Sequence, residues 1–317
     1  DTWLNMGNLG GAAQIASMLL IFVVILISLE RIGRAQQKSF NGADRYRALD
    51  IYPLKGWRAA AASLACGLPF VAGFVVPILV LGNYALRHLE TSWTDEFLSI
   101  ACNSFLLSAI AALLCCLIGL LLAYSKRLHS SKLLLTAVRS AGLGYALPGA
   151  VLAIGVIIPF AAFDNGLDSF MREQFGVSTG LLLSGTAFAI VFAYVVRFLT
   201  VATGSIESSL AKVTPTMDMA ARSLGLNSIQ TLRRVHLPLI RGGLLTGALV
   251  VFVDCMKELP ATLILRPFNF DTLATQVYQY ASDEMIEQSA LSALLIVLVG
   301  LIPVILLSRS ITASRTR

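Results

Sequence analysis

Three ionisable side chains lie within an apolar run of the sequence, V-D-C-M-K-E-L-P-A-T-L, as Asp254, Lys257 and Glu258. On a continuous helix Asp254 and Glu258, four residues apart, share a face, and Lys257 is close enough to neutralise one of them. Pro260 then disrupts the helix. If this apolar run crosses a bilayer, each charged side chain at its centre costs about 2.5 to 3.5 kcal/mol, and these groups must then face protein or water.

Two interpretations of this cluster are open. A carboxylate pair beside a helix break at membrane depth is typical of a translocation path, which makes Asp254, Lys257, Glu258 and Pro260 candidate path residues. Alternatively, Asp254 and Lys257 form an internal ion pair that fixes helix packing, while Glu258 bonds to a neighbouring helix. Arg197, in another apolar run, poses the same question, although its long side chain can instead extend to the nearby membrane surface.

The composition identifies a membrane protein. The 317 residues are 56% hydrophobic and only 13% charged, with mean hydropathy +0.77. About 20 apolar residues cross the bilayer as a helix, and the apolar runs here show no strand alternation, which predicts an all-α integral membrane protein. Seven spans are expected, at residues 10–29, 59–82, 100–124, 141–163, 181–203, 243–265 and 290–308.

The formal charge of +6 follows membrane topology and does not indicate nucleic-acid binding. Basic residues crowd every second connection between spans, whereas the alternate connections hold only Arg87, Arg172 or Arg266. By the positive-inside rule the N-terminus lies outside and the C-terminus in the cytoplasm. The basic connections carry Arg31, Arg34, Lys38, Arg45, Arg47, Lys55 and Arg58, then Lys126, Arg127, Lys132 and Arg139, and then Lys212, Arg222, Arg233, Arg234 and Arg241.

A polar stretch between the fifth and sixth spans carries strong helix signals. Thr214 is suited to an N-cap, Pro215 to the first helical position and Gly225 to a left-handed C-terminal position. A second short helix is expected to start near Asn227 or Ser228. It should stop before Pro238, because the residue that precedes a proline is disfavoured in a helix.

The same stretch resembles the signature of the permease subunits of binding-protein-dependent ABC importers, which reads E-A-A, three residues, G, nine residues, I, one residue, L-P. The corresponding residues, all at the family spacing, are Met219, Ala220, Ala221, Gly225, Val235, Leu237 and Pro238. The family Glu is replaced by Met219, and the acidic Asp218 stands beside it. An ordinary amphipathic surface helix would explain the alanines but not the full spacing.

The resemblance implies a type I importer bundle in the bacterial inner membrane, with a helix pair within residues 204–242 that docks on an ATPase. Two copies of that ATPase subunit would bind ATP and Mg²⁺, since this chain has no G-x-x-x-x-G-K-[ST] sequence and is expected to be a non-catalytic subunit without a cofactor. The other expected partners are an extracytoplasmic binding protein, a second permease half and the lipid bilayer.

A second resemblance concerns the cargo. Residues 258–275, E-L-P-A-T-L-I-L-R-P-F-N-F-D-T-L-A-T, are similar to a segment of ferric-iron importer permeases, which implies ferric iron as cargo. Thiamine, polyamine, sulfate and phosphonate importers have related permeases. A proton-coupled secondary transporter that uses Asp254 and Glu258 is a rival hypothesis. An intramembrane enzyme lacks support, because no H-E-x-x-H or nucleophile-elbow sequence is present.

The resemblance also predicts the domain organisation. Iron-importer permeases are commonly one chain of two similar halves, so residues 1–30 would be the last transmembrane helix of a preceding half, 31–58 a basic cytoplasmic linker and 59–317 a half with six spans. The first residue is Asp, and we interpret the chain as part of a longer polypeptide. Alternatively, the first span is an additional helix of a complete subunit.

The remaining chemistry-bearing residues are interpreted as structural. The five cysteines show no metal-ligand spacing and are expected to be buried small hydrophobes, and no metal site is assigned: Cys66, Cys102, Cys115, Cys116 and Cys255. His236 falls at a free position of the signature and is expected on the surface. Ser104, Ser108 and Ala112 form a small-residue face for close helix packing.

Overall fold

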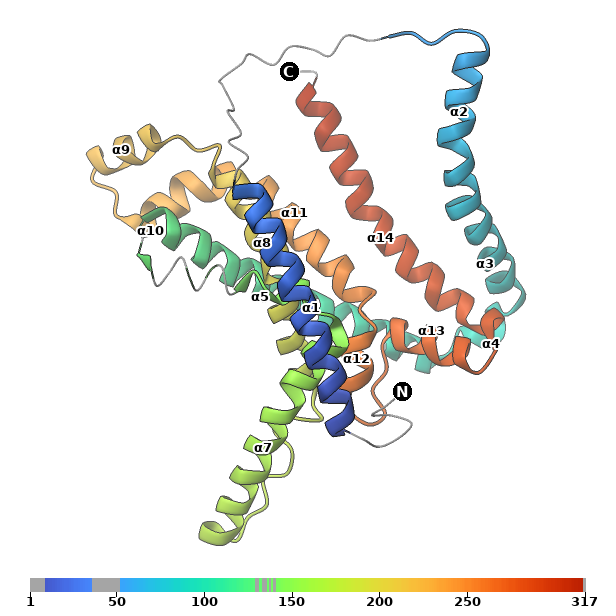
Figure 1. Cartoon of the computed structure of the whole chain (residues 1–317), viewed down its shortest axis with the longest axis vertical. Helices are drawn as coiled ribbons and strands as arrows, with labels where there is room; N and C mark the ends of the chain where they lie inside the picture. Colours follow the sequence, from blue (N-terminus) through green and yellow to red (C-terminus); the bar gives the residue numbers. More distant parts are fainter. Residues whose placement is uncertain are drawn as a thin grey trace.

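The computed structural model describes residues 9–35, 52–128, 131–132, 136, 138 and 141–315, and every regular element among them is a helix (Figure 1). This confirms the all-α prediction. Residues 36–51 of the expected linker, together with His129, Arg139 and Arg317, lie outside the described residues. The longer helices are α1 (Leu9–Ala35), α2 (Trp57–Phe70), α3 (Val76–Arg87), α5 (Asp95–Leu128), α7 (Gly149–Phe175), α8 (Ala187–Leu210), α11 (Leu237–Met256) and α14 (Ile286–Arg315). The shorter ones are α4 (Leu89–Ser92), α9 (Pro215–Ser223), α10 (Ser228–Thr231), α12 (Pro260–Leu265) and α13 (Leu273–Ser282).

Six helical segments of the described chain are long and apolar enough to cross a membrane, and α1 adds a shorter apolar stretch at Ser17–Leu26. The six overlap the second to seventh predicted spans, but three are displaced along the chain. The fourth runs from Gly149 to Phe175, where 141–163 was predicted, and the fifth from Ala187 to Leu210, where 181–203 was predicted. The sixth runs from Ser228 to Met256, where 243–265 was predicted. The fourth span was predicted to end before Asp164, because an ionisable residue usually marks the end of an apolar run. The helix continues past Asp164 because its buried carboxylate is hydrogen-bonded within the protein. Its oxygens accept hydrogen bonds from Ser184 and from the Leu183 amide.

The core lies where α5, α8 and α11 pack against one another. Small side chains make this possible: Ala111, Ala193 and Ala202 are fully buried, and the predicted small-residue face of Ser104, Ser108 and Ala112 is buried as well. The closest approach is at Gly243, where a Cβ atom would lie 1.8 Å from the Ser209 hydroxyl oxygen. Close packing of this kind holds membrane helices together without a hydrophobic driving force.

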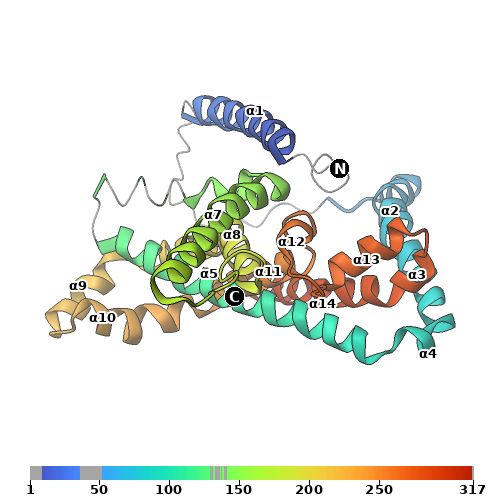
Figure 2. The ribbon, with the colours of Figure 1, turned by 90° about the horizontal axis from the view of Figure 1, so that it is seen from below.

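Helix α5 connects two ends of the bundle. Figure 2 shows α9 and α10 beside one end of α5, and α4 and α13 beside the other. Tyr124 and Arg127 lie on the last turns of α5, next to α9 and α10, whereas Asp95 begins the helix beside α4. A displacement of the α9 and α10 end therefore has a direct route to the rest of the bundle.

The second span contains Pro69 and Pro77 and is not a continuous α-helix. A π-helical turn at Val71–Val75 separates α2 from α3, just after Pro69. In the fourth span, Pro148 is the N-cap of α7. Pro159 lies inside α7 without ending it.

The cysteine prediction holds for three of the five residues. Cys115, Cys116 and Cys255 are buried, whereas Cys66 and Cys102 are exposed on the helix surface. An apolar run places a residue inside a spanning helix, but it does not say whether the side chain faces the bundle or its surroundings.

Candidate functional site

The first signature helix, α9, has the predicted ends. Pro215 occupies its first turn, and Gly225 takes the left-handed conformation with φ 79°. The Gly225 amide donates to the Arg222 carbonyl and the Leu226 amide to the Ala221 carbonyl, which is the Schellman arrangement. Thr214 holds the N-cap position, but its hydroxyl bonds to Thr216 and does not cap the helix.

The second signature helix begins as predicted and then continues where a stop was expected. Asn227 caps α10 in a reciprocal capping box with Gln230. The chain then stays helical through Pro238, by way of a π-helical segment at Leu232–His236 that leads into α11. In a regular α-helix the ring of Pro238 would meet the carbonyl four residues earlier. The wider π turn, in which the Leu237 amide donates to the Leu232 carbonyl, removes that conflict.

The centre of the site is an ion-pair cluster around Asp218, beside the position of the family Glu. Its Oδ2 accepts hydrogen bonds from Arg127 of α5, at 2.9 Å from Nε and 2.8 Å from Nη2. Its Oδ1 lies 2.6 Å from Nε2 of His236. Arg127 also donates to the Leu210 and Val213 carbonyls, so that it ties the end of α8 to the same point.

These contacts set the charge of Asp218. Partial burial raises the pKa of the carboxyl group, but the hydrogen bonds from Arg127 and His236 and the positive charge of Arg127 outweigh it. The pKa of Asp218 is therefore held below its ordinary value, and the carboxylate is ionised at neutral pH.

The prediction that His236 is a surface residue was wrong. Its side chain is 1% exposed and packs edge-on against the Tyr124 ring, with 5.4 Å between ring centroids. The Tyr124 hydroxyl donates to the Ser228 carbonyl at the start of α10. Asp218, Arg127, Tyr124 and His236, here called the Asp218 cluster, thus fasten α9, α10 and the π segment to the end of α5. The motif spacing alone did not indicate Arg127 or Tyr124, and the one available signal was an acid adjacent to Met219.

The other signature residues present an accessible surface. Met219 is 58% exposed, and Leu224 and Ile229 of the same helix pair are 81% and 69% exposed. Ala221 is buried, as close packing requires, while Ala220 and Gly225 remain exposed. Val235 and Leu237 are half-buried on the π segment and the first turn of α11. The helix pair therefore has one face fixed to the bundle and one apolar face free to meet another protein.

The ionisable residues of the sixth span lie at the far end of α11, about 30 Å from Pro238 at 1.5 Å per residue. The helix ends at Met256, residues 257–259 are not helical, and Pro260 occupies the first turn of α12. The break comes before Glu258. The prediction that Asp254 and Glu258 share one helical face was therefore wrong, because a continuous helix was assumed through Lys257.

The two carboxylates have separate partners. Lys257 Nζ lies 2.9 Å from the Asp254 carboxylate, in an ion pair whose lysine is mostly exposed. Glu258 is 6% exposed and lies 3.4 Å from Nε of Arg197 on α8, and it also accepts from the Ala261 amide. Arg197 in turn donates to the Leu147 carbonyl, so it turns inward and does not extend to the membrane surface.

Gly149 allows this buried pair to form. A Cβ at this first residue of α7 would lie 2.5 Å from Oε1 of Glu258 and 2.9 Å from Nη1 of Arg197. The pair thus joins α8, the start of α7 and the break after α11. Within the described part of the chain, no group of three or more His, Cys, Asp or Glu side chains is placed to hold a metal ion.

The known proteins that this chain resembles are named as transport permeases. The ferric-iron transport permease FbpB 2 of Haemophilus influenzae is 27% identical over 95% of this chain and 57% of its own length, and the putative FbpB 1 of the same organism is 24% identical over 88% and 46%. The putative 2-aminoethylphosphonate transport permease PhnV of Salmonella choleraesuis is 22% identical over 80% of this chain and 93% of its own. The chain thus spans about half the length of the first two relatives.

The fold is shared with a solved transporter. A permease chain in the crystal structure of a bacterial alginate ABC transporter, in complex with an alginate-bound periplasmic protein, superposes with a TM-score of 0.59 over 81% of this chain and 95% of its own, at 15% identity. The model of the family described as binding-protein-dependent transport system inner membrane component matches residues 115–316, which include the Asp218 cluster and the break after α11. The chain belongs to this family of transport permeases.

Proposed function

We propose that this chain is the translocation subunit of an ATP-driven importer, and that the exposed face of α9 and α10 docks on an ATPase subunit. The observation that carries the proposal is the combination of a free apolar face at Met219, Leu224 and Ile229 with the Asp218 cluster behind it. A surface that only met solvent would not need this anchoring to the end of α5. ATP and Mg²⁺ belong to two such ATPase subunits in this proposal.

The proposed coupling runs through α11. Helix α10 continues into α11 without interruption, by way of the π segment and Pro238, and α11 ends at the break of residues 257–259. Movement of the docked pair would therefore be delivered along one rigid helix to the break. The Arg197–Glu258 pair would hold the far side of the break to α8 and α7.

The ionisable residues then divide between the two uses that the sequence left open. Asp254 and Lys257, the more accessible pair, are assigned to the translocation path together with Pro260, which is exposed at the break. Glu258 is assigned to the packing of the break, because it is buried and paired with Arg197. An internal pair of opposite charge is the usual way to keep ionisable groups within a spanning bundle.

The proposed cargo is ferric iron, delivered by an extracytoplasmic binding protein. Support comes from the two relatives named as ferric transport permeases and from the segment of residues 258–275. The proposed setting is the bacterial inner membrane, with α9 and α10 in the cytoplasm and with a second permease half completing the path. The α4 and α13 end would then face the binding protein.

The test is the ATPase activity of the transporter assembled around this chain in liposomes, with its ATPase subunits and a panel of binding proteins loaded with ferric iron, thiamine, a polyamine or 2-aminoethylphosphonate. Stimulation by the iron-loaded protein alone supports the proposal in full. Stimulation by another loaded protein keeps the mechanism and replaces the cargo. Uptake that an uncoupler abolishes while ATP is maintained would favour a proton-coupled transporter and contradict the proposal.

A further inference from the structure

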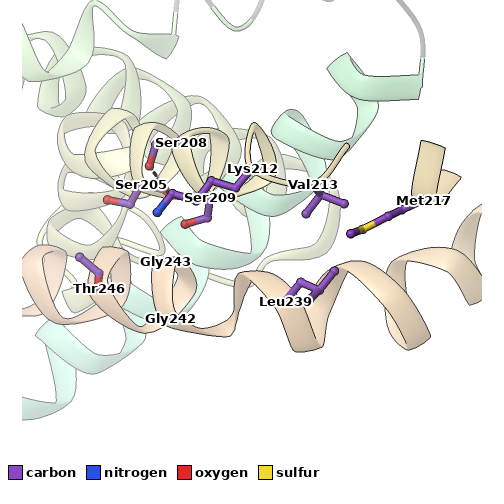
Figure 3. Close-up of a pocket in the computed structure, with 10 residues that line it drawn as sticks. All are labelled: Ser205, Ser208, Ser209, Lys212, Val213, Met217, Leu239, Gly242, Gly243 and Thr246. Carbon is purple, nitrogen blue, oxygen red and sulfur yellow. Dashed lines mark hydrogen bonds between the residues drawn. The ribbon is translucent and has the colours of Figure 1, made fainter. Parts of the chain in front are cut away.

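A cavity of about 440 Å³, lined by both polar and apolar side chains, lies between the end of α8 and the start of α11, beside α9 (Figure 3). One wall is the last turns of α8 with the residues that follow, and the other is α11. The lining residues are Ser205, Ser208, Ser209, Lys212, Val213, Met217, Leu239, Gly242, Gly243 and Thr246. The signature motif does not include any of these residues, and the proposed transport path does not use them.

The charge of the cavity favours an anion. Among the described residues, Lys212 is the only ionisable one that lines the cavity, and none of them forms an ion pair with it. The nearest acid in sequence, Glu207, is paired with Lys126 at 2.9 Å and does not line the cavity. A lone ammonium group in a pocket without carboxylates attracts negative charge.

The hydroxyl groups of the cavity provide hydrogen-bond donors for an anion. Hydroxyls on a spanning helix usually donate to a carbonyl one turn earlier, as Thr203 of α8 does to Leu199. Ser205, Ser209 and Thr246 make no such bond in the described structure, whereas Ser208 donates to the Ser205 carbonyl. Figure 3 shows these side chains, with Lys212, around the space between the two helices.

The position of the cavity sets the kind of ligand. The candidate membrane span of α8 ends at Leu210, and Lys212 lies two residues beyond it. In the proposed topology this end of α8 is cytoplasmic, which would put Lys212 near the lipid headgroups. The cavity is flanked by exposed apolar side chains, Met217 and Leu239, which suit the boundary with acyl chains. Basic pockets between transmembrane helices on the cytoplasmic side are typical sites for anionic headgroups.

We propose that this cavity binds a phosphate group, presented by an anionic phospholipid or by a soluble phosphate, with Lys212, Ser205, Ser209 and Thr246 as donors. The site goes beyond the transport proposal, because it does not depend on the cargo. The bound phosphate would bridge α8 to α11 next to α9, at the point where Gly243 lets the two helices touch.

The experiment measures lipid retention on the full-length chain in its transporter, released from nanodiscs and weighed by native mass spectrometry. Nanodiscs of phosphatidylcholine contain a graded fraction of phosphatidylglycerol. The variants are Lys212→Gln, the double variant Ser209→Ala with Thr246→Val, and the control Lys132→Gln, which removes an exposed lysine beyond the end of α5. Loss of one charged donor should weaken the site about tenfold.

The two sources of phosphate are distinguished by competition. Phosphatidylglycerol retained on the wild type and on Lys132→Gln, weakened in both cavity variants and unaffected by millimolar inorganic phosphate, identifies a lipid site. Displacement by inorganic phosphate, with weakening in the same variants, identifies a soluble phosphate. Equal retention by the wild type and the double variant would overturn the proposal. Because the double variant retains Lys212, it tests the site even if Lys212→Gln fails to fold.

Discussion

Arg127 and Asp218, 91 residues apart in the sequence, form a charge-assisted pair that joins the end of α5 to α9. The arginine uses all of its nitrogen atoms at this junction, because it also holds two carbonyls at the end of α8. The helix pair is thereby fixed to two core helices at once. This pair is the structural basis for the proposed transmission of force.

Replacement of Arg127 by Met should uncouple the transporter. Asp218 would keep His236 but lose its guanidinium partner, at a cost of about 1 to 3 kcal/mol in the free energy of unfolding. We expect loss of ATPase stimulation by the loaded binding protein in a variant that still inserts. The matched control is Lys126→Met, which breaks the more exposed pair with Glu207 and should cost under about 1 kcal/mol. Equal effects of the two substitutions would contradict a special function of Arg127.

The Asp218 cluster also predicts a pH dependence. Because the pKa of Asp218 is lower in the folded state than in the unfolded chain, its contribution to stability is present above the unfolded pKa, about 4. The contribution is lost as the pH falls through the folded value. Thermal unfolding followed from pH 7 to pH 3 should therefore show a smaller acid-induced loss for Asp218→Asn than for the wild type. An identical loss in both would refute this assignment.

Substitutions at Gly225 can distinguish the effect of backbone strain from the effect of lost contact with a partner. Gly225 has φ 79° and no atom within 4 Å of the Cβ position, so a substitution meets strain but no internal clash. Asn and Asp tolerate the left-handed region better than other residues. We expect Gly225→Asp to insert normally and to abolish transport, whereas Gly225→Asn, of similar shape, should retain part of it. Normal transport by Gly225→Asp would remove this residue from the docking surface.

Gly149 tests the buried pair at the break. Gly149→Ala places a methyl group 2.5 Å from Glu258 Oε1 and should destabilise the protein by about 1 to 3 kcal/mol through forced displacement of the pair. Gly155→Ala, on the same helix with open space around it, is the control and should be neutral or slightly stabilising. Thermal unfolding in the same detergent compares the two. A neutral Gly149→Ala would show that the pair is readily displaced.

Much of the helical scaffold could be predicted because membrane spans depend on local hydropathy. The ends of α9 could also be predicted, since Pro215 and Gly225 act through their own backbone preferences. The continuation of the helix through Pro238 could not be predicted, because the π turn before Pro238 involves packing of His236 against Tyr124, more than 100 residues away. Glu258 and Arg197 could be identified as out of place in an apolar run, but not as partners. Their pairing depends on how α8 packs against the break, which a single sequence does not show.

The most direct test of the docking assignment is site-specific photocrosslinking from two exposed leucines at opposite ends of the molecule. Leu224, 81% exposed beside Gly225, and Leu86, 77% exposed near the end of α3, would each be replaced by a photoreactive amino acid in the assembled transporter. We expect a crosslink to the ATPase subunit from position 224 and none from position 86. A crosslink from position 86, or none from position 224 in an assembly that hydrolyses ATP, would contradict the docking assignment.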